Sequence, residues 1–381
     1  MRNVSDTIAR LAAFRARLGA DAAGQSGRLD ILRDFGSNPG SLDARFHLPD
    51  ALPDHAPLVV VLHGCTQTAD GYDAMSGWST LADEAGFALL YPQQSRSNNP
   101  NLCFNWFNPE DAARDRGETL SIRQMVEAMI VRHGLDRKRV FVTGLSAGGA
   151  MAASLLATYP EVFAGGGIIA GLPHGSATTV PQAFDRMRGH GGPSQHDLQR
   201  LLARASTHQG PWPAISIWQG TADRTVAPSN AEAIAGQWNG VHGLDATPTH
   251  LTTAGHHTKR AWHGRTGHAV LEINMIAGMG HGTPLDGKLG AAGPFMLDVG
   301  ISSTQELARF WGVAPMMATD IQGITVGRRK VPNAQPKHVQ QNVPGAASPA
   351  DLHESPSYTV HPSSGTRKII EDALRAAGLM R

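Results

Sequence analysis

Residues 140–149 have the sequence VFVTGLSAGG, in which a serine lies between two glycines directly after an apolar run. The β-branched and aromatic residues from Val140 to Thr143 favour a buried strand. The segment from Ala147 to Tyr159 predicts a helix that ends before Pro160. A Gly-x-Ser-x-Gly turn between a strand and a helix is typical of a nucleophile elbow, so Ser146 is the candidate nucleophile.

The same turn also has a plainer interpretation. The chain contains 43 glycines, so a Gly-x-Ser-x-Gly pattern arises by chance and can be an ordinary strand-to-helix turn. The elbow interpretation is favoured because the flanking strand and helix supply the context that the motif requires. In an elbow the neighbouring glycines are needed because the serine backbone is strained and larger residues would collide.

The segments around this turn predict the rest of the fold. Continuously apolar runs predict further central strands, at residues 58–62, 87–91, 164–170 and 214–218. Helical spacing of apolar residues predicts a helix over residues 120–133, and residues 259–263 and 269–277 predict a hairpin. This alternation predicts an α/β protein of the α/β-hydrolase fold, with a mostly parallel central sheet and helices on both faces.

The composition along the chain predicts four segments. Residues 1–39 are predicted to hold an N-terminal amphipathic helix and a lead-in, and residues 40–315 to form the α/β-hydrolase catalytic domain. Residues 316–365 are rich in Pro, Gly, Gln and Ser and predict a low-complexity linker. Residues 366–381 predict a C-terminal amphipathic helix.

A serine nucleophile needs a base and an acid, which in this fold follow it in the order acid, then histidine. Asp223 follows the strand at 214–218 in the loop GTAD, at the edge of the sheet where catalytic groups gather. The alternative for this residue is a capping or turn aspartate. The order and position predict Asp223 as the catalytic acid.

The candidate base is His281, in the glycine-flanked sequence GMGHG after the predicted hairpin. A loop without bulky neighbours allows an imidazole to reach the serine hydroxyl. The chain has 18 histidines, and the competitors lie within or beside the hairpin, at His256, His257, His263 and His268.

The sequence LHGCTQ at residues 62–67 follows the first central strand and predicts the loop of the oxyanion hole. We expect the backbone N–H groups of Cys65 and Ala147 to be the two donors. The alternatives are a simple turn at His63 and a buried thiol at Cys65. Cys65 and Cys103 are the two cysteines, and their pairing stays open at this point.

Composition limits the partners. The net charge is +1, with 33 basic and 32 acidic residues, which argues against nucleic acid and against an anionic membrane as partners. No run of eighteen apolar residues is present, so no transmembrane segment is predicted. Arginines interrupt the N-terminal apolar stretch, so no secretory signal is predicted and the default location is cytoplasmic.

Several motifs in this order resemble the poly(3-hydroxybutyrate) depolymerase family of carboxylesterases, a group shared with feruloyl and acetylxylan esterases. They are LHGCTQ at 62–67, CFNWF at 103–107, GLSAGG at 144–149, GLP at 171–173 and GTAD at 220–223. The resemblance covers about residues 40–312. Its members are frequently secreted, which makes an extracellular location the alternative.

The resemblance implies ester hydrolysis by Ser146, Asp223 and His281, with no metal or organic cofactor. Small esters or soluble oligomeric polyesters of short hydroxyalkanoates are the expected substrates, with feruloyl or acetylxylan esters as the alternative. It also implies Trp106, with His63 of the predicted oxyanion loop, as substrate-binding residues. The rival readings are a serine peptidase of the same fold and a binding module without turnover, and the oligomeric state stays open.

Overall fold

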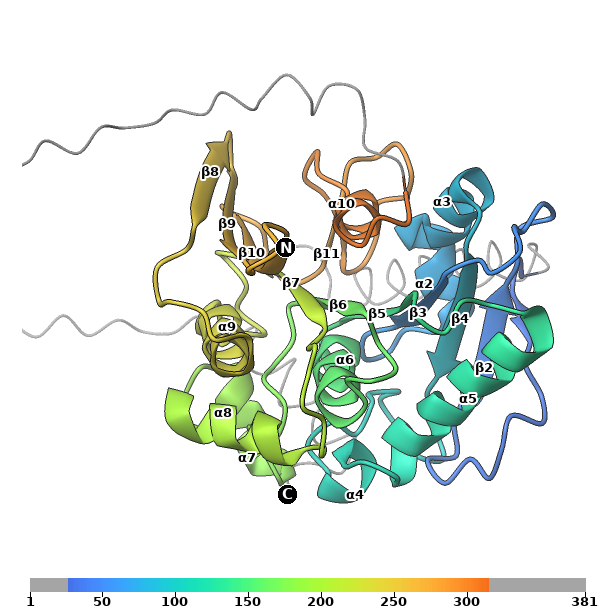
Figure 1. The fold of residues 1–381 in the computed structure, drawn as a ribbon, viewed down its shortest axis with the longest axis horizontal. Coiled ribbons are helices and arrows are strands. Elements are labelled where there is room, and N and C mark those ends of the chain that lie inside the picture. Colours follow the sequence, from blue (N-terminus) through green and yellow to red (C-terminus); the bar gives the residue numbers. More distant parts are fainter. Residues whose placement is uncertain (1–26, 315–381) are drawn as a thin grey trace, which may run out of the picture. The chain divides into compact units, whose positions relative to one another are not determined.

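The computed structural model describes residues 27–314, which form a large sheet covered by helices on both faces (Figure 1). The predicted N-terminal helix, the linker and the C-terminal helix lie outside the described residues. The sheet has ten strands in the order β1-β2-β4-β3-β5-β6-β7-β10-β9-β8. The strands are β1 Asp30–Ile31, β2 Asp43–His47, β3 Leu58–Leu62, β4 Ala88–Gln93, β5 Val140–Leu145, β6 Gly165–Ile169, β7 Ala214–Gly220, β8 His250–Ala254, β9 His257–His263 and β10 Ala269–Ile276.

The middle of the sheet is parallel, and its two edges are antiparallel. Strands β4, β3, β5, β6, β7 and β10 pair in parallel, so their carboxyl ends lie at one edge of the sheet. Strands β1 and β2 extend one side in antiparallel pairing, and β9 and β8 extend the other. A separate pair, β11 (Thr283–Leu285) and β12 (Met296–Asp298), lies after β10 in the chain.

Helices lie between the successive strands from β3 to β8 and after β12. Their bounds are α2 Ala69–Ser76, α3 Trp78–Ala85, α4 Pro109–Ala112, α5 Gly117–His133, α6 Ala147–Thr158, α7 Val180–Met187, α8 Gln195–Arg204, α9 Ser229–His242 and α10 Ser303–Phe310. Within residues 27–314, none of these helices has the length and apolar character that a membrane span requires.

Strand β3 shows how the core is divided. Its alternate residues enter two separate apolar clusters, because successive side chains of a strand point to opposite faces. Leu58, Val60 and Leu62 join the cluster that contains residues of α5, α6 and α9. Val59 and Val61 join the cluster that contains residues of α2, α3 and α10. Burial on both faces explains why this strand is a continuous apolar run.

The predicted α/β-hydrolase fold is confirmed, with strands at each of the apolar runs and the hairpin at β9 and β10. The sheet begins at Asp30, before the predicted domain boundary at residue 40. The two-residue strand β1 is exposed and too short to show an alternating pattern. The edge strand β8 was also not predicted, since all five of its residues are exposed and its sequence lacks an apolar face.

Candidate active site

Ser146 occupies a sharp turn between β5 and α6. Its backbone has φ 58° and ψ −116°, a conformation that residues with a side chain rarely adopt. The turn is held by two hydrogen bonds at 2.9 Å, from Ser146 N–H to the carbonyl of Ile169 and from Ala150 N–H to the carbonyl of Ser146. The strain and its supports place the hydroxyl at the carboxyl edge of the sheet, which is the geometry of a nucleophile elbow.

The glycines of this turn are required by close approaches of the backbone. A Cβ atom on Gly144 would lie 2.4 Å from the carbonyl oxygen of Gly148. A Cβ atom on Gly148 would lie 2.5 Å from the carbonyl oxygens of both Leu62 and His63. The first turn of α6 therefore packs directly against the loop that follows β3, and only glycine leaves room for this contact.

Asp223, which is buried, and His281, which is partly buried, form a hydrogen-bonded pair. The Nδ1 atom of His281 lies 2.7 Å from Oδ2 of Asp223, and Asp223 is 4% exposed. Burial opposes ionisation of this carboxyl, but the hydrogen bond and charge interaction with His281, together with two backbone N–H donors, hold the pKa of Asp223 below its usual range. A carboxylate at Nδ1 keeps the proton on that nitrogen and leaves Nε2 of His281 as the basic atom.

The loops that carry this pair are tied to each other. Ala222 N–H donates to the carbonyl of Met279 at 3.0 Å, and Gly278 N–H donates to Oγ1 of Thr221 at 2.9 Å. The ring of Phe295 also packs edge-on against the imidazole of His281, with ring centroids 6.0 Å apart. The histidine is thus held both by its hydrogen bond to Asp223 and by this aromatic contact.

The competing histidines lie elsewhere. His256 Nε2 is 2.8 Å from the carbonyl of Val299, and His257 Nε2 is 2.9 Å from Oδ1 of Asn274. His263 contacts His250 on the exposed hairpin. Within residues 27–314, no hydrogen bond joins the Ser146 hydroxyl to His281, as is common for catalytic pairs in the absence of substrate.

The loop after β3 leaves a backbone donor free. Gly64 N–H donates to Oε1 of Gln67 at 2.8 Å, and Thr66 N–H donates to the carbonyl of Asn101 at 2.7 Å. In the described part of the chain, neither the N–H of Cys65 nor that of Ala147 donates to a protein acceptor. Two unpaired N–H groups, one from this loop and one from the start of α6, are the composition of an oxyanion hole.

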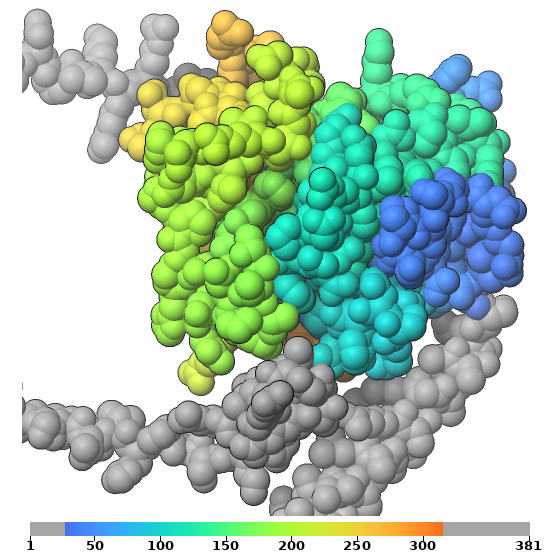
Figure 2. Space-filling view, turned by 90° about the horizontal axis from the view of Figure 1, so that it is seen from below, coloured from blue at the N-terminus to red at the C-terminus, as the bar shows by residue number. Residues whose placement is uncertain are grey.

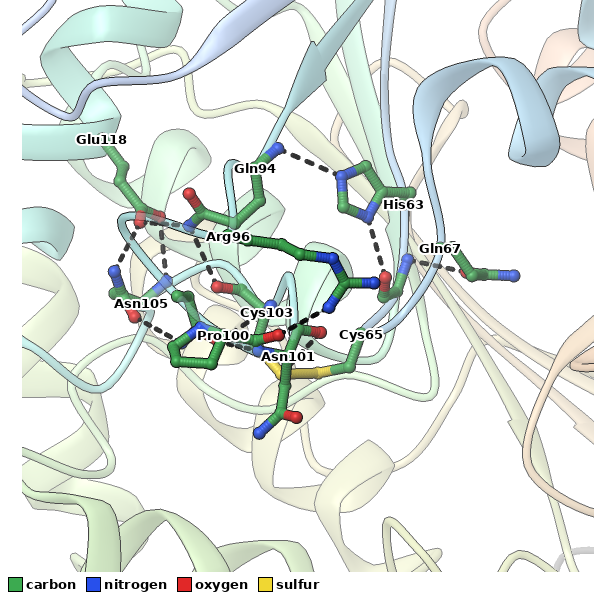
Figure 3. The surroundings of a disulfide bond; sticks show 12 residues. His63, Cys65, Gln67, Gln94, Arg96, Pro100, Asn101, Cys103, Asn105 and Glu118 are labelled. Carbon is green, nitrogen blue, oxygen red and sulfur yellow. Dashed lines mark hydrogen bonds between the residues drawn. A yellow bond between two sulfur atoms is a disulfide. The ribbon is translucent and has the colours of Figure 1, made fainter. Parts of the chain in front are cut away.

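Cys65 and Cys103 form a disulfide bond, which resolves the pairing that the sequence left open. Their Cα atoms lie 4.3 Å apart, and the bond joins the loop after β3 to the loop after β4 (Figure 3). Cys65 is therefore not a free thiol, and the cross-link restrains the residue whose N–H group is one of the two free donors.

His63 does not have the environment of a substrate ligand. It is 1% exposed, its Nδ1 lies 2.8 Å from the carbonyl of Gly64, and its Nε2 accepts from the N–H of Gln94 at 3.2 Å. Burial lowers the pKa of His63 to about 4, so the ring is neutral. With both nitrogens bonded to backbone groups, the side chain holds the loop, and the expectation of direct substrate contact is not supported.

Trp106 lies in the apolar core on the side of α5 and α6, and it is 6% exposed. Its ring packs edge-on against Phe107 at a centroid distance of 5.7 Å. Phe107 lines a groove of about 390 Å³ between the segments 98–111 and 178–180, which lie side by side in blue-green and yellow-green in Figure 2. The other side chains of the groove are mostly polar: Asn98, Asn105, Asn108, Asp111, Thr178 and Thr179.

One further residue, Gln219, contacts the carboxylate of this pair. Gln219 is buried, and its Nε2 donates to Oδ2 of Asp223 at 3.1 Å. Its role was not predicted, although its position four residues before Asp223 at the end of a strand is a usable signal. Within residues 27–314, no cluster of three or more His, Cys, Asp or Glu side chains could hold a metal ion.

The α/β-hydrolase fold, a serine elbow and a hydrogen-bonded Asp–His pair define the class of this protein as a hydrolase of that fold. Residues 43–260 match the family described as "Esterase PHB depolymerase". The chain belongs to this family and is a carboxylic ester hydrolase.

Individual relatives agree with this assignment. The poly(3-hydroxyalkanoate) depolymerase C of Paucimonas lemoignei is 45% identical over 292 residues, which cover 75% of this chain and 70% of that protein. The feruloyl esterase B of Talaromyces funiculosus is 29% identical, over 68% of this chain and 74% of that protein. The structure of an acetyl xylan esterase from Aspergillus awamori superposes with a TM-score of 0.66 at 26% identity, covering 76% of this chain and all of that one.

Proposed function

We propose that Ser146, His281 and Asp223 form the catalytic triad of this esterase. The observation that carries the proposal is the 2.7 Å hydrogen bond between the buried Asp223 and His281, on the same sheet edge as the strained Ser146. Nε2 of His281 accepts the hydroxyl proton as Ser146 attacks the ester carbonyl. The N–H groups of Cys65 and Ala147 bind the oxyanion of the tetrahedral intermediate.

The intermediate collapses when the imidazolium returns its proton to the leaving alcohol, which leaves an acyl group on Ser146. A water molecule then attacks the acyl carbonyl while His281 takes one of its protons. Collapse of the second intermediate releases the carboxylic acid and restores the serine hydroxyl. Asp223 stabilises the positively charged imidazolium in both steps.

For the substrate, we propose short hydroxyalkanoate esters or soluble oligomers of them. Support comes from the 45% identity to a protein named as a poly(3-hydroxyalkanoate) depolymerase. Feruloyl or acetylxylan esters are the second candidate, supported by the relatives that carry those names.

The location of the protein is best inferred from the disulfide. Disulfides persist in oxidising compartments and are rare in the cytosol, so Cys65–Cys103 favours an extracellular or other oxidising location. The cytoplasmic location expected from the N-terminal sequence is not supported.

The test compares the wild type with Ser146→Ala on p-nitrophenyl acetate, butyrate and octanoate, methyl ferulate and 3-hydroxybutyrate oligomers. We expect turnover by the wild type alone and the highest kcat/KM on short acyl groups and hydroxybutyrate oligomers. Higher kcat/KM on methyl ferulate would select the second candidate. Equal activity of both proteins would show that Ser146 is not the nucleophile.

A further inference from the structure

Glu118 is a buried carboxyl group that the proposed acyl transfer does not use. It lies in the first turn of α5 and is 0% exposed. Its Oε1 accepts from the side-chain amides of Gln94 at 2.6 Å, Asn105 at 2.8 Å and Asn98 at 3.1 Å. Its Oε2 accepts from the backbone N–H of Asn105 at 2.9 Å. Four N–H donors surround this one carboxyl, and their hydrogen bonds favour its ionised form, which burial by itself disfavours.

All four donors belong to one segment, residues 94–105, which follows β4. Figure 3 shows Gln94 and Asn105 beside Glu118. Glu118 therefore joins the first residue of this segment, Gln94, to its last, Asn105. The Nε2 of Gln94 also donates to the carbonyl of Cys103 at 3.0 Å. The segment has no helix or strand of its own, so its shape depends on these side-chain contacts.

The segment in turn holds the loop that carries the proposed oxyanion donor. Cys103 is bonded covalently to Cys65. The backbone N–H of Gln94 donates to His63, and the other nitrogen of that ring contacts the carbonyl of Gly64. A third contact runs from Thr66 N–H to the carbonyl of Asn101. These three attachments surround the N–H of Cys65 on both sides along the chain.

We infer that Glu118 is a positioning residue for ester hydrolysis: by holding the segment 94–105, it fixes the Cys65 N–H where the oxyanion of the transition state forms. This inference rests on the proposed function. Displacement of an oxyanion donor lowers kcat more than KM, because the negative charge exists only after attack on the carbonyl.

The charged groups around Glu118 predict a pH dependence. Burial, and then the nearby carboxylate of Asp111 on α4, raise the pKa of Glu118 to about 8. The groups that face it from the segment 94–105 are neutral amides, and Arg116 pairs with Glu110 instead. Protonation places an O–H group among N–H donors and removes an acceptor. The contacts are therefore complete only for the carboxylate form, on the alkaline side of this pKa.

The test is Glu118→Gln, assayed for kcat and KM on p-nitrophenyl butyrate from pH 6 to pH 9.5. Above pH 8, where the wild type carries the carboxylate, we expect the kcat of Glu118→Gln to lie about 10- to 100-fold below that of the wild type, part of the loss seen when an oxyanion donor is removed, while KM stays within about threefold. The wild-type profile should contain a rise near pH 8 that the variant lacks. Ser97→Ala is the matched control and should keep the wild-type kcat, because this exposed side chain lies in the same segment and contacts Ser95 rather than Glu118.

A kcat of Glu118→Gln within about twofold of the wild type at about pH 9 to 9.5, at equal folded fraction, would overturn the inference. A loss carried by KM alone would overturn it as well. If Glu118→Gln does not fold, Asn98→Ala removes one donor and should lower kcat about threefold, and an unchanged kcat in that variant would overturn the inference. An inert wild type would instead refute the proposed function, whereas an active wild type with an inert Ser146→Ala leaves only the role of Glu118 at issue.

Discussion

The side-chain amide of Gln219 donates a hydrogen bond to Oδ2 of Asp223, the same oxygen that His281 contacts through Nδ1. The other oxygen of Asp223 accepts from the N–H groups of Thr225 and Val226, at 2.8 and 2.9 Å. Four donors thus fix the plane of the Asp223 carboxylate. The orientation of this plane in turn sets the orientation of the His281 imidazole.

Substitution of Gln219 should slow turnover. Gln219→Met keeps the approximate volume and removes the donor to Asp223, so the carboxylate can rotate away from His281. We expect kcat to fall about 10-fold, the equivalent of one hydrogen bond to a charged group. Steady-state kinetics on p-nitrophenyl butyrate measure this, and Gln209→Met at an exposed position is the control. A kcat equal to that of the wild type would show that the backbone N–H groups of Thr225 and Val226 are enough to hold the carboxylate of Asp223 against His281.

Loss of the disulfide should lower both stability and activity. Cys65 and Cys103 are 38 residues apart, and a cross-link of that span stabilises by about 4 kcal/mol when its main effect is on the unfolded chain. We expect the double variant Cys65→Ser/Cys103→Ser to show a lower Tm and, well below that Tm, a lower kcat.

Thermal unfolding with and without a phosphine reductant checks the stability effect. The reductant should lower the Tm of the wild type and leave the Tm of the double variant unchanged. A wild type that keeps its Tm after complete reduction would contradict the assigned stabilising role.

The stability of the wild type should fall with rising pH in a way that depends on Glu118. Burial raises the pKa of this carboxyl from its ordinary value of 4.5 to about 8 in the folded protein. A raised pKa gives stability that is fully present below pH 4.5 and is lost as the pH rises through 8. Between pH 6 and pH 9 this loss is roughly 3 kcal/mol.

Urea unfolding at pH 6 and pH 9 measures this effect. Glu118→Gln cannot ionise and should show a much smaller decrease in the free energy of unfolding than the wild type. Glu110→Gln, an exposed change on α4, should behave as the wild type does. Equal decreases in the wild type and Glu118→Gln would refute the prediction.

The close approach at Gly148 predicts a severe effect of one methyl group. In Gly148→Ala the new Cβ would lie 2.5 Å from two backbone carbonyl oxygens, and backbone cannot move aside as a flexible side chain can. We expect a loss of at least about 2 kcal/mol in stability, together with loss of activity. Gly236→Ala in α9 meets only side-chain atoms of Gln195, the nearest at 3.2 Å, and should be tolerated. Circular dichroism melts and esterase assays compare the two variants.

Much of the fold could be predicted because its central strands are buried on both faces. Leu58–Leu62 and Val140–Leu145 are continuous apolar runs, which a parallel central strand requires and an exposed segment does not. The edge strands β1 and β8 were missed for the opposite reason. They are exposed, so neither burial nor alternation left a pattern in their residues.

The main residues of the candidate site could also be chosen from the sequence. Ser146 and Asp223 could be chosen from residue order and from their places after β5 and β7, since parallel strands bring their carboxyl ends to one edge. His281 was separated from its competitors by position in the chain, and the hydrogen bond to Asp223 agrees with that choice.

Local patterns in the chain were sufficient to predict the elbow, the order of the catalytic candidates and the central strands of the sheet, because each depends on neighbouring residues and on burial. The disulfide, the burial of His63 and the four donors around Glu118 depend on contacts between segments that lie far apart in the chain. A buried carboxyl among amides has no periodicity and no local motif. Its environment exists only when β3, the segment after β4, and α5 are packed together.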